Sequence, residues 1–221
     1  MIYRQIVSPG AHMTERLSEK AYHLIKQKII TLELPPSEVI NEQDLMVDLG
    51  LGRTPIREAL LQLAKEDLVT VVPRRGMFVA DISITDLQKI FEVRIVLEGF
   101  CARLAAQRVT QEHLAQMESL LEELEQLSNE DVEALMHSDR HFHQLLYQAA
   151  DNEFLSEALN RLYAPSLRLW HLALDRLEDV KGTIELHRDI VEAVKSRDGA
   201  RAEALIQQHV SEFQHKIKAV L

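Results

Sequence analysis

The stretch from residue 49 to residue 79 constrains the fold of this chain most strongly. Gly50 and Gly52 are typical of a turn, and Thr54 followed by Pro55 is typical of an N-cap followed by a proline at the first helical position. Apolar residues then recur at the spacing of a helix face, and two short β-branched runs follow around a Pro-Arg-Arg-Gly turn. The stretch therefore predicts a turn, a helix and a β-hairpin with a basic tip.

The predicted helix carries two arginines near its start. Arg53 and Arg57 are four residues apart and therefore share one helix face. Guanidinium groups fit phosphates and guanine edges, and a recognition helix enters the major groove with its N-terminal residues first. Strands at Val69–Val72 and Met77–Ala80 would form a wing whose basic tip reaches a neighbouring groove. The pattern favours a winged helix-turn-helix, and the alternative is a small helix-and-hairpin subdomain with ordinary surface arginines.

The charge of the whole chain argues against binding to nucleic acid, but the acidic excess is confined to the second part of the sequence. The net charge is −10, but residues 1–80 hold 10 basic and 10 acidic side chains, whereas residues 81–221 hold 15 and 25. A local basic patch in the first part can therefore still bind DNA. The single cysteine, Cys101, excludes an intrachain disulfide and suits a reducing cytoplasm. No apolar run is long enough to span a membrane, so no membrane association is expected.

The chain is expected to be mainly α-helical and to divide into four parts. Residues 1–13 are a disordered leader or tag remnant, because Pro-Gly-Ala-His-Met resembles a cloning scar. Residues 14–80 form the winged helix-turn-helix domain, and residues 81–84 are a linker. Residues 85–221 show helical patterns throughout and predict an antiparallel bundle of six or seven helices.

Capping residues and helix-breaking residues predict where the individual helices begin and end. Asn41 and Thr110 are predicted N-caps, whereas a break near Glu92 and a kink at Pro165 leave the number of bundle helices open. The expected helices cover about 14–32, 42–49, 84–107, 110–127, 130–150 and 153–174, a segment ending near 196, and 198–219.

Ionisable residues interrupt the apolar stripes of three predicted bundle helices. Asp139 and His143 are four residues apart on the inner face of one helix, and His187 and His209 occupy similar positions on the last two. A buried ionisable group is costly unless it is paired, and convergence on a divalent cation relieves that cost. Three imidazoles and one carboxylate suit zinc, nickel, manganese or iron. The alternative is that each histidine is an ordinary hydrogen-bonded core residue.

Two sequence runs carry a family resemblance. Gly-Leu-Gly-Arg-Thr-Pro-Ile-Arg-Glu-Ala-Leu and the later Pro-Arg-Arg-Gly-Met-Phe-Val resemble the signature of the GntR family of bacterial transcription regulators. Gln43 stands where that family often has a basic residue, which puts this one contact in doubt. As DNA-binding residues the resemblance implies Gln43, Arg53, Thr54, Arg57, Arg74, Arg75 and Gly76.

Residues 85–215 resemble the FCD ligand-binding domain of the FadR-like branch of that family. Its pattern has Asp-x-x-x-His on one helix and single histidines on two later helices, and its effectors are commonly small organic acids. Arg94 would bind an effector carboxylate or else pair with Glu98, its neighbour one turn on, and Arg168 is a weaker candidate. The resemblance implies a homodimer on an inverted repeat, with repression relieved by ligand. As metal ligands it implies Asp139, His143, His187 and His209.

The leading interpretation is a DNA-binding transcription regulator controlled by a small carboxylate at a metal-containing pocket, and the family resemblance implies a repressor. One alternative is a DNA-binding structural protein whose bundle only dimerises around a purely structural metal. Another is a helical metalloenzyme, in which an open metal position activates water. Against the enzyme, no further inward Glu or Lys is evident as a general base, and the winged domain would go unused.

Overall fold

The computed structural model describes residues 16–173, 182 and 186–220. The expected leader at 1–13 and most of the expected loop at 178–182 lie outside these residues. The chain divides into two compact units. Residues 1–29 and 33–80 form the first unit, and residues 30–32 and 81–221 form the second. In the described part of the chain, none of the helices has the length and hydropathy that a membrane span requires.

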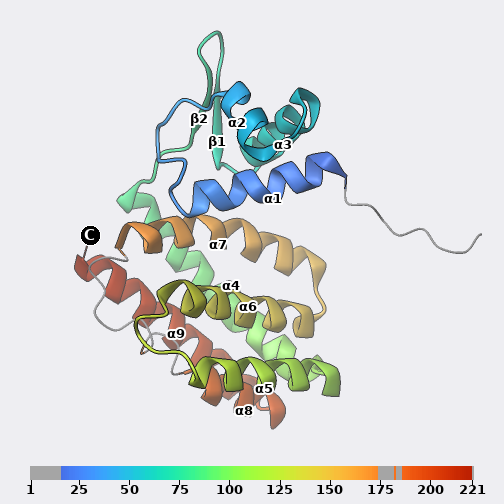
Figure 1. Cartoon of the computed structure of the whole chain (residues 1–221). Helices are drawn as coiled ribbons and strands as arrows, with labels where there is room; N and C mark the ends of the chain where they lie inside the picture. Colours follow the sequence, from blue (N-terminus) through green and yellow to red (C-terminus); the bar gives the residue numbers. More distant parts are fainter. Residues whose placement is uncertain (1–15, 174–181, 183–185, 221) are drawn as a thin grey trace, which may run out of the picture. The chain divides into compact units, whose positions relative to one another are not determined.

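The first unit consists of three helices followed by a hairpin (Figure 1). The side chain of Asn41 accepts a hydrogen bond from the backbone N–H of Gln43, which confirms the predicted cap of the second helix. This helix ends at Gly50, whose φ of 63° is the left-handed conformation that favours glycine. The elements are α1 (Leu17–Ile30), α2 (Glu42–Leu49), α3 (Arg53–Lys65), β1 (Val69–Val72) and β2 (Gly76–Val79).

The start of α3 corrects one expectation. Gly52, and not Thr54, is the N-cap, and no side chain caps this end. Arg53 is therefore the first helical residue and Pro55 the third. Proline is tolerated there because the amides of the first helical turn have no intrahelical acceptor. As a result, both Arg53 and Thr54 belong to the exposed first turn of the helix.

The hairpin is anchored along one edge. β1 and β2 pair antiparallel, from Val69 opposite Val79 to Val72 opposite Gly76. Residues 37–40 add a further short stretch to β2, because Ile40 N–H donates to the Met77 carbonyl. The periodicity had not indicated this pairing, since a Pro-Pro pair directly precedes the segment. β2 is thus paired on both sides, with β1 and with residues 37–40, while the tip of the hairpin is exposed.

The second unit contains six helices among the described residues from 81 onward. The break considered near Glu92 does not occur, because α4 is continuous there, and α7 continues through Pro165. Thr110 caps α5 as predicted, and the side chain of His113 completes a capping box. The helices are α4 (Ile84–Arg108), α5 (Gln111–Glu125), α6 (Val132–Ala150), α7 (Glu153–Ala173), α8 (His187–Lys195) and α9 (Gly199–Val220).

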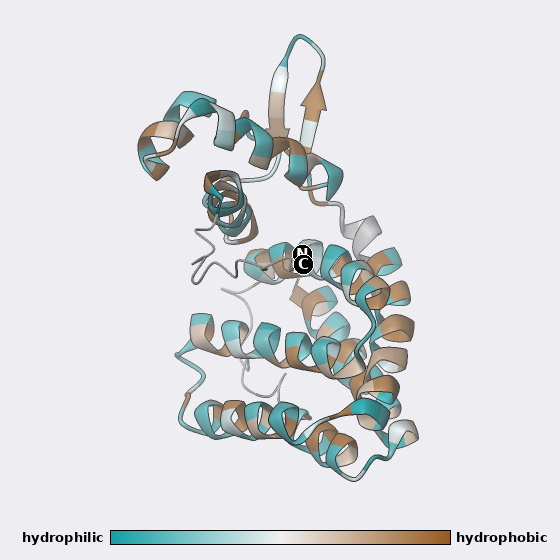
Figure 2. Ribbon diagram, turned by 90° about the vertical axis from the view of Figure 1, so that its right-hand side faces the viewer, coloured by the Kyte–Doolittle hydropathy of each residue, from teal (hydrophilic) through white to brown (hydrophobic). Residues whose placement is uncertain are grey.

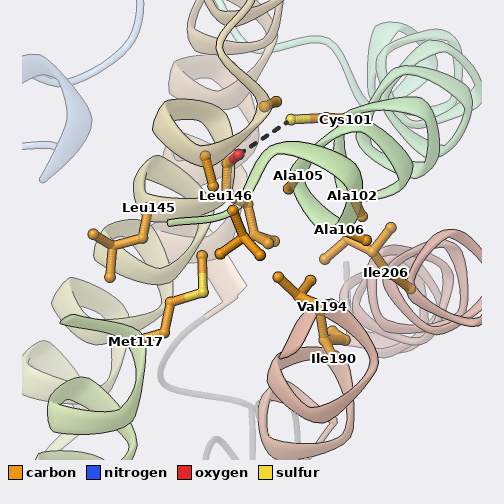
Figure 3. Close-up of a cluster of buried hydrophobic side chains, with 14 of the residues drawn as sticks. Cys101, Ala102, Ala105, Ala106, Met117, Leu145, Leu146, Ile190, Val194 and Ile206 are labelled. Atoms are coloured by element: carbon orange, nitrogen blue, oxygen red, sulfur yellow. Dashed lines mark hydrogen bonds between the residues drawn. The ribbon is translucent and has the colours of Figure 1, made fainter. Parts of the chain in front are cut away.

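Helix α4 organises the core of this unit, because it packs against α6, α7, α8 and α9. Figure 2 shows the amphipathic helices, with hydrophilic and hydrophobic residues on different faces. Small residues of α4 let the other helices approach, and the Cys101 thiol donates to the Leu146 carbonyl across the cluster in Figure 3 (3.7 Å). At Gly99, an added Cβ would lie 2.5 Å from Nε2 of Gln207, so glycine permits the close approach of α9.

Candidate metal centre and DNA-binding surface

Three histidines and one aspartate from three helices meet in the interior of the second unit. Helix α6 contributes Asp139 and His143, α8 begins at His187, and α9 contributes His209. Nε2 of His187 and Nε2 of His209 each lie 3.3 Å from Oδ1 of Asp139. Nε2 of His143 lies 3.8 Å from the same oxygen. The four residues lie together as predicted, and their role as metal ligands stays a prediction.

The distances from Oδ1 of Asp139 to Nε2 of His187 and of His209 suit two neighbouring ligands of one small divalent cation, and the distance to Nε2 of His143 is slightly longer. Metal–ligand bonds of about 2.0–2.2 Å in a tetrahedron place neighbouring donors about 3.3–3.6 Å apart. Asp139, His143 and His209 offer ligand atoms that all lie within 4.8 Å of one another. The buried Nε2 of His187 has no hydrogen-bond partner among the described residues, although it lies close to Asp139. This nitrogen is therefore available to a cation, and the donor set suits zinc or another transition metal.

A tyrosine and a glutamate make further contacts with Asp139 and His143. The Tyr163 hydroxyl donates to Oδ2 of Asp139 (2.8 Å), which leaves Oδ1 to the histidines. Oε2 of Glu98 lies 3.1 Å from Nδ1 of His143. Sequence reasoning missed Tyr163 and treated Glu98 only as a partner of Arg94. Glu98 is buried, and its ion pair with Arg94 and its contact with His143 make it part of the surroundings of the cluster.

The charges of these buried groups are set by their mutual contacts. Burial disfavours the charged form of Asp139, but the adjacent histidines, His143 foremost, outweigh it and hold the pKa of Asp139 well below its usual range. Burial likewise opposes ionisation of Glu98, yet His143 and Arg94 lower its pKa to about 2. Burial lowers the pKa of His187 to about 3. Burial disfavours the charged form of His143 too, but Glu98 and Asp139 outweigh it and raise the pKa of His143. The cluster thus holds two carboxylates, a neutral His187 and a His143 that favours its proton, and a bound cation would have to displace that proton.

A narrow cavity opens onto the cluster. Its volume is about 10 Å³, which holds about one water molecule. Arg94 lines the cavity and also pairs with Glu98, so the structure contains the ion pair that was one of the two expectations for this residue. Arg168 is buried but is not among the lining residues, which makes it a poor candidate for contact with an effector. The cavity is lined by Arg94, Asp139, His143, Tyr163, Ser166, Leu167, Trp170, His209, Val210 and Phe213.

The first unit carries the predicted DNA-binding residues on its surface. At the start of α3, Nε of Arg53 and Nε of Arg57 lie 3.2 and 3.5 Å from the two carboxylate oxygens of Glu42. Glu42, which sequence reasoning did not single out, therefore holds the two guanidinium groups side by side. The following residues of the predicted set are all exposed: Gln43, Arg53, Thr54, Arg57, Arg74, Arg75 and Gly76.

The tip of the hairpin depends on unusual backbone angles. Arg74 has a φ of 63° and Gly76 a φ of 105°, both in the region that L-residues rarely adopt. The Arg75 N–H donates to the Val72 carbonyl and closes the turn. The Arg75 guanidinium lies 5.9 Å from the centre of the Phe78 ring. The turn therefore presents both arginines outward from a compact hairpin.

Comparison with known proteins decides between the classes that the site leaves open. Residues 17–79 match the family described as bacterial regulatory proteins, gntR family, and residues 89–212 match the FCD domain. The chain belongs to the GntR family of regulators and carries an FCD domain. A GntR-family regulator binds DNA and controls transcription, so the enzyme alternative is set aside.

Full-length relatives agree with this assignment. The HTH-type transcriptional repressor RspR of Escherichia coli K12 is 26% identical over 208 residues, covering 94% of this chain and 91% of the relative. The HTH-type transcriptional repressor GlaR of the same organism is 32% identical over 201 residues, covering 86% and 90%. The solved structure of E. coli McbR/YncC has a TM-score of 0.83 at 23% identity, covering 92% of this chain and 97% of that one, and supports the fold.

Proposed function

We propose that this GntR-family regulator is a homodimeric repressor of an inverted-repeat operator. A small carboxylate, bound at a divalent metal in the FCD domain, would lower the affinity of the repressor for DNA. One observation carries the proposal. The Nε2 atoms of three buried histidines gather around Oδ1 of Asp139, at a cavity that Arg94 also lines. A core built only for stability would not need four ionisable groups at one point.

The residues around the cavity have complementary tasks in this proposal. Asp139 and the three histidines would hold the metal, and a six-coordinate cation would keep two further positions for ligand oxygens. The guanidinium of Arg94 would pair with an effector carboxylate. Nε of Arg94 and Nε1 of Trp170 are buried donors without a hydrogen-bond partner among the described residues. Oxygens of an organic acid would relieve that unfavourable burial.

The small size of the cavity suggests how binding would reach the DNA. An organic acid needs more room than the about 10 Å³ present, so its binding must displace lining side chains. Those side chains come from α4, α6, α7 and α9. Helix α4 begins at Ile84, five residues after β2 ends at Val79, so a shift of α4 would change the spacing of two winged domains in a dimer. Such coupling between sites is typically worth about 1–3 kcal/mol.

The proposal is tested on DNA from the source organism. Purified, zinc-loaded protein is mixed with sheared genomic fragments, and the retained fragments are sequenced. We expect retention of a few fragments that share an inverted repeat. One compound from a panel of small carboxylates should release these fragments from the protein. Retention of every fragment with a steep salt dependence, or of none, would contradict a specific operator. Trp170 is the single tryptophan and lines the cavity, so its fluorescence should report the same carboxylate.

An exposed apolar stripe on α4 supports the homodimer. Val93, Val96 and Phe100 are 47%, 61% and 45% exposed and recur at helical spacing on one face. Two winged domains on an inverted repeat require twofold symmetry, and a stripe near the start of the FCD domain would lie against its own copy in such a dimer. A second copy of this chain is therefore the occupant that we propose for this face.

Replacing Phe100 by glutamate should weaken self-association. The new carboxylate would lose hydration in an apolar interface, a cost of several kcal/mol when no partner is present, and the dimer dissociation constant should rise at least about 100-fold. Sedimentation velocity over a concentration series measures this constant. Phe154→Glu is the matched control, because Phe154 is 78% exposed on α7. Equal association of both variants would argue against the α4 face.

A further inference from the structure

The carboxylate of Glu98 lies between the proposed effector residue and the proposed metal centre. Glu98 is 1% exposed and sits in the middle of α4. Its Oε1 accepts hydrogen bonds from Nη2 of Arg94 (3.0 Å) and from the hydroxyl of Tyr147 (2.7 Å). Its Oε2 lies 3.1 Å from Nδ1 of His143. One buried carboxylate therefore holds three side chains from two helices.

The contact with His143 determines which ring nitrogen can bind a metal. In a neutral imidazole one nitrogen carries the proton and the other carries the lone pair. A carboxylate at Nδ1 favours the proton there, which leaves the lone pair on Nε2. Nε2 is the atom that faces Asp139, at 3.8 Å from its Oδ1. Glu98 thus stabilises the tautomer and the ring orientation that ligation requires.

The other two histidines lack such support. Within the described residues, Nδ1 of His187 and Nδ1 of His209 are buried without a hydrogen-bond partner. The ring of His187 is instead stacked on Phe142, with centroids 3.8 Å apart and planes 15° apart. His143 is therefore the one histidine of the three whose second nitrogen meets an anionic side chain in this part of the chain.

We propose that Glu98 is a positioning residue of the metal centre, which fixes His143 for ligation and at the same time holds Arg94 at the cavity. The inference rests on the proposed metal site. Groups that hydrogen-bond to a ligating histidine orient it and raise its basicity, and their loss typically weakens metal binding about 10- to 100-fold. Arg94 is held by the same carboxylate, so the effector residue and one metal ligand share a single support.

Zinc affinity of the full chain tests the proposal. Glu98→Gln keeps the size of the side chain but removes the anionic acceptor, and its zinc dissociation constant should rise about 10- to 100-fold in competition with a chelator of known affinity. Glu92→Gln is the matched control, because Glu92 is exposed on the same helix. Since Glu98→Gln leaves Arg94 without its carboxylate, the double variant Arg94→Met/Glu98→Gln removes both charges and guards against misfolding. The double variant should show at least the same loss.

A spectroscopic measurement separates positioning from simple stability. In zinc-loaded wild-type protein labelled with ¹⁵N-histidine, the Nδ1–H of His143 should be visible and slow to exchange, and Glu98→Gln should lose this signal. Wild-type affinity in a folded Glu98→Gln protein that also keeps the signal would overturn the positioning role while leaving the metal site intact. Failure of the wild-type protein itself to bind zinc would instead overturn the proposed function.

Discussion

Replacing Asp139 by alanine is expected to abolish tight binding of zinc. Oδ1 of Asp139 is the oxygen around which Nε2 of all three histidines gather, so the variant removes the only anionic member of the proposed set. Loss of a ligand should exceed the about 10- to 100-fold effect of losing a supporting group, so we expect the zinc dissociation constant to rise well over about 100-fold. Equilibrium dialysis followed by elemental analysis measures the bound metal.

The control for this variant is Glu133→Ala, an exposed carboxylate on the same helix. It should keep one zinc per chain. Stoichiometric zinc in Asp139→Ala, at wild-type affinity, would exclude Asp139 as a metal ligand and contradict the proposed four-residue centre. Replacing His187 by alanine tests whether the metal centre takes part in regulation. The carboxylate that releases the wild-type protein from its operator should no longer release this variant.

Replacing both Arg53 and Arg57 by alanine is expected to abolish specific operator binding. Both side chains are more than half exposed at the start of α3, where a recognition helix meets base edges and phosphates. An arginine bound to a guanine is typically worth about 1–3 kcal/mol, so losing two should weaken binding roughly 30-fold to 20,000-fold. Fluorescence anisotropy with an operator fragment measures this change at fixed salt.

Two comparisons make the DNA experiment specific. Arg201→Ala removes an exposed arginine of α9 in the other unit and should leave operator affinity unchanged. Zinc binding should be unchanged in the Arg53→Ala/Arg57→Ala variant, because its substitutions lie in the first unit. Wild-type operator affinity in that variant would exclude the start of α3 as the recognition surface.

Local sequence signals predicted the local structure well. Asn41 and Thr110 cap their helices because each offers a side-chain oxygen to a free backbone amide, a property readable from the residue and its neighbours. The start of α3 was misplaced by two residues, because a proline fits any position of a first helical turn and does not mark the cap. The suspected break near Glu92 does not occur, because α4 is stabilised by the helices that pack around it.

Contacts between helices could be predicted less well from the sequence. Helical spacing placed Asp139 and His143 on one face, but bringing His187 and His209 to them rested on family resemblance, since periodicity does not tell which helices are neighbours. Tyr163 was missed for the same reason: its hydroxyl meets a carboxylate on another helix. The contacts of Glu42 with the arginines of α3 and of Glu98 with His143 of α6 were likewise not predicted, because they join residues of different helices.

The most direct test of the metal centre is anomalous X-ray diffraction from crystals of the zinc-loaded protein, measured on both sides of the zinc absorption edge. We predict one anomalous peak per chain, about 2.0–2.2 Å from Oδ1 of Asp139 and from the Nε2 atoms of the three histidines. A zinc-loaded crystal with no peak at that point, and with zinc only at exposed residues such as His137 and His141, would contradict the proposed centre.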